Sequence, residues 1–177
     1  MKELDLPKSL KEIAAGSFSN NGTYGVKALE KVNYGGELKD WFMIDFEENP
    51  LRNADLYCKN KKITANDFIV DTGLGSNRTY QTPEGVTVLK KNCFTNNGSW
   101  FASGEIKLII SGEVVKIYAG AFNNVRSFNE VDMFGQWRSY KSEADTEGTE
   151  LDLSNEKSVA AWINSIGLDG GYCWKKV

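Results

Sequence analysis

Histidine is absent from this chain of 177 residues, and cysteine and proline are scarce, with three of each. Without histidine, serine–histidine and cysteine–histidine catalytic pairs are excluded, and so is the commonest transition-metal ligand. Cys58, Cys93 and Cys173 lie far apart, so no C-x-x-C metal or redox motif exists. No pair of carboxylates is flanked by a nucleophile and a base in one local frame. We therefore expect no catalytic residue, no metal site and no cofactor.

Long apolar runs are also missing, and none approaches the roughly 20 residues needed to cross a bilayer. Residues 1–8 contain no apolar segment after a basic start, so no signal peptide is visible. The net charge of −3 lacks the basic footprint of a nucleic-acid-binding protein. With 41% hydrophobic and 25% charged residues, the composition is that of a globular chain. We expect one folded domain, or one with a small appendage, no membrane span and no nucleic-acid partner.

What the chain does contain is three copies of a short motif. The copies span residues Pro7–Asn21, Pro83–Asn97 and Ser111–Val125, and they align without gaps. Each has an aliphatic residue, a second one three positions later, and a phenylalanine five positions after that, with a small residue just before the phenylalanine. Because a repeat of about 23 residues cannot bury its own apolar side, neighbouring repeats must stack.

Alternating apolar residues lie on either side of these copies, as at Leu4 and Leu6 before the first copy and at Val131 and Met133 after the third. Period-two alternation predicts short strands with one buried face. The side chains expected to fill the core between coils are Leu10, Ile13, Phe18, Val86, Leu89, Phe94, Val114, Ile117, Phe122, Phe128 and Val131.

This pattern resembles the BspA-like leucine-rich repeat, whose unit reads roughly L-x-x-I-x-x-x-A-F-x-x-C-x-x-L-x-x-V-x-I-P. The third copy follows it most closely, from Val114 to Met133. The family's cysteine position holds Asn21, Asn97 and Val125 here. The resemblance implies an α+β, β-rich fold, a leucine-rich-repeat solenoid of about 4–5 coils. It also implies a non-enzymatic role in gut-bacterial surface proteins or phage virion proteins.

A second resemblance covers Tyr34–Thr64, which is similar to a unit inserted between coils in many gut-bacterial and phage proteins with these repeats. It implies a helical turn and a small hairpin, with Asn60 and Lys61 at the hairpin turn. We place the insert at residues 35–82. Residues 71–82 are rich in Gly, Asn and Thr and indicate a loop. Residues 73–76 (Gly-Leu-Gly-Ser) lack the further glycine and lysine of a phosphate-binding loop.

The last segment, residues 136–177, predicts a cap or docking element after a solenoid at 1–135. Its acidic run at 143–150 does not follow the glycine and glutamate spacing of a calcium loop. Ser154 is the expected helix N-cap and Gly167 the C-cap. Apolar residues on one face of the helix between them are Val159, Trp162, Ile163 and Ile166. A last strand is expected within 170–177, because an open solenoid end needs a cover.

In the resembling family, side chains between the buried strand positions point outward and offer contacts. Trp100 and Trp137 lie beside glycine and polar residues, so each is either an exposed contact residue or buried under its loop. The candidate partner contacts are Asp5, Lys31, Asn33, Trp100, Lys107, Ile109, Asp132 and Trp137. This mixed-charge face suits a protein partner, with a glycan as an alternative.

Two functions remain open from the sequence. The first is a phage virion or tail-associated component, or a host-attachment component. The second is a bacterial cell-surface or secreted adhesion module that binds host protein or glycan. Both place the chain in a virion or at the cell surface. Leu4 and Leu6 predict an exposed strand edge, so we expect a protein partner or a second copy to bind at this N-terminal edge or at the C-terminal segment.

Overall fold

The structure, a computed structural model, describes residues 2–20, 23–24, 29–47, 49–52, 54–73, 77–94, 100–101, 104–122, 125, 127–165 and 172–177. Strands account for 34% and helices for 13%, and the chain winds into a β-solenoid of about three turns. This confirms the predicted short, β-rich solenoid with a C-terminal helix. The turns are fewer than the four to five coils that the family resemblance implied.

The first half of the solenoid is built on three parallel strands, β1 (Glu3–Leu6), β5 (Lys31–Tyr34) and β7 (Asp55–Cys58). The shorter elements of this half are β2 (Glu12–Ile13), β3 (Ser19–Asn20), β4 (Thr23–Tyr24), α1 (Leu38–Trp41), β6 (Asp45–Phe46), the 3-10 turn η2 (Pro50–Arg52) and β8 (Lys61–Lys62). β2 and β6 pair in parallel on a second side of the coil, and β8 forms a hairpin with β7.

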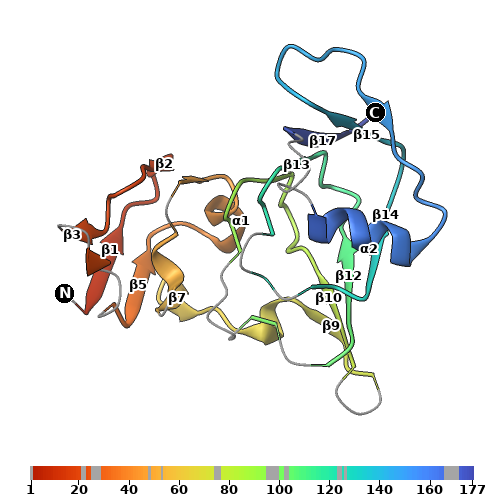
Figure 1. Cartoon of the computed structure of the whole chain (residues 1–177). Coiled ribbons are helices and arrows are strands. Elements are labelled where there is room, and N and C mark those ends of the chain that lie inside the picture. Colours follow the sequence, from red (N-terminus) through yellow and green to blue (C-terminus); the bar gives the residue numbers. More distant parts are fainter. Residues whose placement is uncertain are drawn as a thin grey trace.

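The second half repeats this plan with β10 (Arg78–Gln81), β12 (Ile106–Ile110) and β14 (Glu130–Met133), again all parallel. The 3-10 turn η3 (Ala65–Asp67) and β9 (Ile69–Asp71) link the halves, and β9 runs antiparallel to β10. Figure 1 shows the two sets of strands side by side, with the N-terminal set on the left. The halves share one core, in which Trp41 of α1 donates a hydrogen bond from Nε1 to the Cys93 carbonyl oxygen at 3.2 Å.

A second sheet of the second half combines solenoid strands with strands of the C-terminal segment. Its order is β11 (Val88–Leu89), β13 (Lys116–Tyr118), β17 (Cys173–Lys176), β15 (Trp137–Tyr140) and β16 (Thr149–Glu150). β11 and β13 are parallel, whereas β17, β15 and β16 join antiparallel. Helix α2 (Glu156–Ser165) packs against β14, where it covers the last strand of the other sheet (Figure 1).

The three motif copies make the same local bonds. Leu10, Val86 and Val114 each donate from the backbone N–H to the carbonyl oxygen three residues earlier, at 3.0 to 3.3 Å. A second turn of this kind ends at the small residue before each phenylalanine, at Ser17, Cys93 and Ala121. The residue just before that small residue has a left-handed backbone in all three copies, at Gly16 (φ 79°), Asn92 (φ 56°) and Gly120 (φ 76°). The repeat is therefore a repeat of backbone geometry as well as of side chains.

Because Gly16 has a left-handed backbone, adding a Cβ atom at this position should lower the stability of the protein measurably. We expect Gly16→Ala to lower the free energy of unfolding by about 1–2 kcal/mol, because left-handed backbone is unfavourable for residues other than glycine. Gly16→Asn is the matched control. Asparagine tolerates this conformation and already occupies the equivalent position 92, so its loss should be smaller. Urea unfolding followed by tryptophan fluorescence measures both, and equal losses would contradict the assignment.

The predicted repeat core is buried in most places but open at the first coil. Leu10 and Phe18 are only half-buried, like Leu4 and Leu6 on β1. This follows from the order of the sheet, because β1 is its outer strand and, among the described strands, pairs with β5 alone. The fully buried members of the predicted set are Ile13, Val86, Leu89, Phe94, Val114, Ile117, Phe122, Phe128 and Val131.

Part of the predicted insert follows the solenoid path. Lys31 of β5 lies opposite Glu3, 28 residues earlier, and opposite Asp55, 24 residues later. In the second half, Lys107 lies opposite Thr79 and Glu130 at spacings of 28 and 23 residues. β6 and β7, both within residues 35–82, thus extend ladders that begin with β2 and β1. The motif was not recognisable there because α1 lengthens the arc between β5 and β6.

Two boundary predictions were wrong by one residue. The β7–β8 hairpin turns at Lys59 and Asn60, both with positive φ, rather than at Asn60 and Lys61, because Cys58 pairs with Lys61. The N-cap of α2 is Asn155, not Ser154, since the Asn155 Oδ1 atom accepts from the backbone N–H of residues 157 and 158 at 3.0 and 3.2 Å. The predictions for Asn21, Asn97, Ile166 and Gly167, and part of segment 73–76, lie outside the described residues.

Candidate functional site

The outward strand positions of the first half form an ion-paired row. Along the ladder the row reads Glu3, Lys31 and Asp55, and the Lys31 Nζ atom lies 3.7 Å from a Glu3 carboxylate oxygen. Asp55 is paired with Lys62 of β8 at 2.6 Å. The next row contains Asp5, Asn33 and Tyr57, in which Asn33 Nδ2 donates to Asp5 Oδ1 at 2.7 Å. These charges alternate in sign and neutralise one another on the protein's own surface.

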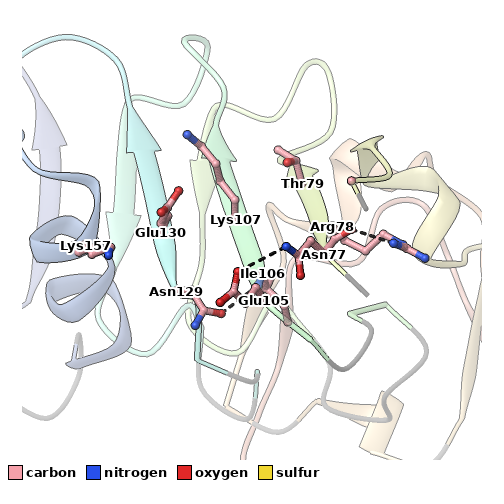
Figure 2. A pocket seen from close by; sticks show the side chains of 10 residues that line it. Asn77, Arg78, Thr79, Glu105, Ile106, Lys107, Asn129, Glu130 and Lys157 are labelled. Carbon is pink, nitrogen blue, oxygen red and sulfur yellow. Dashed lines mark hydrogen bonds between the residues drawn. The ribbon is translucent and has the colours of Figure 1, made fainter. Parts of the chain in front are cut away.

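The equivalent positions of the second half are less regular. Thr79, Lys107 and Glu130 lie opposite one another on β10, β12 and β14, and Gln81, Ile109 and Asp132 form the next row. Figure 2 shows Thr79, Lys107 and Glu130 on neighbouring strands of this face. Ile109 is the one apolar member of these two rows, and it is half-buried between polar neighbours.

A cavity of about 530 Å³ opens at the N-terminal ends of these strands (Figure 2). Its walls are polar, and the residues that line it are Gly73, Asn77, Arg78, Thr79, Glu105, Ile106, Lys107, Asn129, Glu130 and Lys157. Asn77 Nδ2 donates to Glu105 Oε2 at 3.4 Å. The Asn129 Oδ1 atom accepts from the Ile106 N–H at 2.9 Å, which extends the ladder by a side chain. The cavity is thus a polar hollow on a sheet face, and its lining includes three cationic side chains and two carboxylates.

Helix α2 contributes charge to the same region. The Lys107 Nζ atom lies 2.7 Å from a Glu156 carboxylate oxygen. This hydrogen bond raises the pKa of Lys107 and lowers the pKa of Glu156. Both groups are therefore charged at neutral pH, and the pair ties the start of α2 to the outward face of β12.

The side chains on this face can bind a partner through ion pairs and hydrogen bonds. In the part of the chain that the structure describes, no group of three or more cysteine, aspartate or glutamate side chains is placed to hold a metal ion. Burial raises the pKa of Cys58 to about 12, and also raises the pKa values of Cys93 and Cys173. All three thiols are free, buried and protonated near neutral pH, so they are poor nucleophiles.

The structure brings the predicted contact residues together only in part. Lys107, Ile109 and Asp132 share the outward face of the second half, whereas Asp5, Lys31 and Asn33 share that of the first. The cavity residues Arg78 and Asn129 were not predicted. Arg78 is the first residue of β10, and Asn129 immediately precedes β14. The only sequence signal for either is its position next to a run of alternating apolar residues.

Of the two alternatives for Trp100 and Trp137, the one in which they are exposed contact residues is wrong. Trp100 and Trp137 are each only 1% exposed. Trp100 packs against Phe68 at 4.9 Å between ring centroids, and its Nε1 atom finds no partner among the described residues. Trp137 is the first residue of β15, and its Nε1 atom donates to the Phe134 carbonyl at 3.1 Å. Both stand beside polar residues in sequence, yet the coil and the C-terminal sheet cover them.

None of the helices within the described residues is long and apolar enough to span a bilayer. No protein-family model, no curated protein and no solved structure matches this chain.

Proposed function

We propose that this chain is a non-enzymatic protein-binding or structural module, and that its partner docks on the outward face of β10, β12 and β14. The observation that carries the proposal is the arrangement around Ile109. This half-buried apolar side chain lies between Gln81 and Asp132 in its row, next to the row that contains Lys107. An apolar centre with a polar, charged rim is the usual anatomy of a protein–protein contact.

The cavity at the N-terminal ends of these strands also supports the outward face of β10, β12 and β14 as the docking surface. It lies beside Lys107 and offers amide, hydroxyl, ammonium and carboxylate groups within one hollow. Outward strand positions of stacked repeats form extended surfaces of the kind that solenoid proteins use for binding. A protein partner that places one side chain in the hollow and an apolar group on Ile109 would use both features.

We propose a phage virion or tail-associated component, or a host-attachment component, as the biological setting. This rests on the resemblance of the motif copies to BspA-like leucine-rich repeats. The candidate contacts for assembly include the outer strand β1, whose Leu4 and Leu6 side chains are half-buried. A mass-spectrometric search of purified phage particles and of the cell envelope, both from the source culture, separates this setting from a cell-surface or secreted adhesion module.

The docking face is tested by one substitution at its centre. We expect Ile109→Asp to weaken capture of the specific partner by about 1–3 kcal/mol, roughly 5- to 150-fold, because an apolar contact is replaced by a charge. The measurement is quantitative mass spectrometry of proteins retained from host lysate and envelope on the immobilised chain. Val115→Asp is the matched control, since Val115 is 47% exposed and lies on neither strand row of this face. A partner retained equally by both variants would argue against this face.

A further inference from the structure

The five-stranded sheet β11–β13–β17–β15–β16 carries a row of three cations directly opposite one another. Lys116 of β13 pairs with Lys175 of β17, and Lys175 pairs with Arg138 of β15. Residues that pair in an antiparallel ladder point to the same face, so three cationic side chains leave one face from neighbouring strands that are about 4.8 Å apart. The row ends at Glu150 of β16, which lies opposite Arg138.

None of these three cations forms an ion pair within the part of the chain that the structure describes. Within the described residues, no carboxylate oxygen lies within 4.0 Å of the charged nitrogens of Lys116, Lys175 or Arg138. Arg138 donates instead to the Glu147 carbonyl oxygen at 2.5 Å. Like charges directly opposite one another destabilise a sheet. The row Glu3, Lys31 and Asp55 in the same molecule avoids this cost by alternating the sign.

Tyrosines hold the lysines in place. The Lys116 Nζ atom lies 4.1 Å from the ring centroid of Tyr118 and donates to its hydroxyl at 2.7 Å. Lys175 Nζ lies 4.3 Å from the ring centroid of Tyr140. Cation–π contacts of this kind fix the lysine position and leave the positive charge in place. The row is thus an ordered set of positive charges rather than three independent flexible side chains.

The rings of Tyr118 and Tyr140 are already in contact with other residues of the chain. Lys90 as well as Lys116 lies over Tyr118, at 4.8 Å. Gly148 packs so closely on Tyr140 that a Cβ atom there would be 2.9 Å from the ring. Binding of single-stranded nucleic acid relies on open aromatic faces for base stacking, which these two rings do not offer. Strand β17 is paired on both sides, by β13 and β15, so an extended peptide cannot add to the sheet at this row.

We propose that this row binds an acidic polysaccharide, one that presents sulfate or carboxylate groups along an extended, hydroxyl-rich chain. Charge complementarity selects a polyanion, and a row of cations across three neighbouring strands suits an extended chain. Tyr140, whose ring lies next to the Lys175 ammonium group, also carries a hydroxyl group, which is of a kind that pairs with sugar hydroxyls. This surface is on a different sheet from Ile109. The proposal for this row is therefore independent of the proposed protein-docking face.

The test is a fluorescence-anisotropy titration of labelled dextran sulfate with the full chain at low ionic strength. We expect saturable binding that weakens as salt increases. Lys175→Gln should weaken binding about tenfold, since it removes the central charge-assisted contact. Lys175→Arg keeps the positive charge, so it should retain most of the binding to dextran sulfate. Lys31→Gln is the matched control, because Lys31 also stands on an outward strand position, 4.9 Å from a tyrosine ring centroid, but is ion-paired. It should change binding less than about twofold.

Three results would overturn the proposal. One is absence of dextran sulfate binding at low salt. A second is equal loss of binding in Lys175→Gln and Lys31→Gln. The third is binding of poly-glutamate or oligothymidylate that matches dextran sulfate at equal charge, which would assign the row to an acidic protein or to nucleic acid. Thermal unfolding of each variant checks the fold, and Lys116→Gln tests the same row if Lys175→Gln is unstable.

Discussion

Phe122→Ala is expected to lower the free energy of unfolding by about 3–5 kcal/mol, the usual range for truncating a fully packed aromatic side chain. Phe122 is 7% exposed, its ring stacks on Phe94 with 5.0 Å between centroids, and it meets Phe128 edge-on at 5.5 Å. Phe94 belongs to the second motif copy, whereas Phe122 and Phe128 lie in the next coil, between β13 and β14, so the substitution leaves a cavity between two neighbouring coils. Urea unfolding followed by circular dichroism measures the loss.

Two controls come from the chain itself. Phe134 is 50% exposed, so Phe134→Ala should change stability by no more than about 0.5 kcal/mol. Phe18 occupies the same motif position as Phe122 but is half-buried at the outer coil, so Phe18→Ala should give an intermediate loss. A loss well under about 1 kcal/mol for Phe122→Ala would contradict the stacked-coil core.

Trp41→Ala is expected to have a comparable effect, about 3–5 kcal/mol, through a different contact. Trp41 is fully buried in α1, where its ring lies 4.7 Å from that of Phe46 and 5.7 Å from that of Tyr34. Its indole N–H reaches across to the Cys93 carbonyl of the second half. The side chain therefore joins the two halves of the solenoid by packing and by a hydrogen bond.

Trp41→Phe separates these two contributions. Phenylalanine keeps most of the ring packing but removes the donor, so the Cys93 carbonyl loses its partner at a cost of about 1–3 kcal/mol. Trp162→Phe is the control, because Trp162 is half-buried and its side chain donates to no residue in the described part of the chain. Equal unfolding midpoints for Trp41→Phe and Trp162→Phe would show that the bond between the halves contributes nothing.

The local features of the fold were within reach of the sequence, because each depends on neighbours in the chain. The three copies predicted stacked coils from the spacing of Leu10, Ile13 and Phe18 and their counterparts. The turns and left-handed residues of those copies then recur at matching positions, at Gly16, Asn92 and Gly120. The C-terminal helix was predicted from its apolar face, and it forms with its N-cap one residue after the expected position.

The candidate surfaces needed the tertiary structure, because they depend on which distant strands become neighbours. Lys116, Arg138 and Lys175 are far apart in sequence, and only the antiparallel return of β17 between β13 and β15 aligns them. The same is true of burial at Trp100 and Trp137, which polar sequence neighbours concealed. Short-range spacing therefore determined the repeating coil. Long-range strand pairing, which no local pattern encodes, decided which side chains are covered and which charges meet.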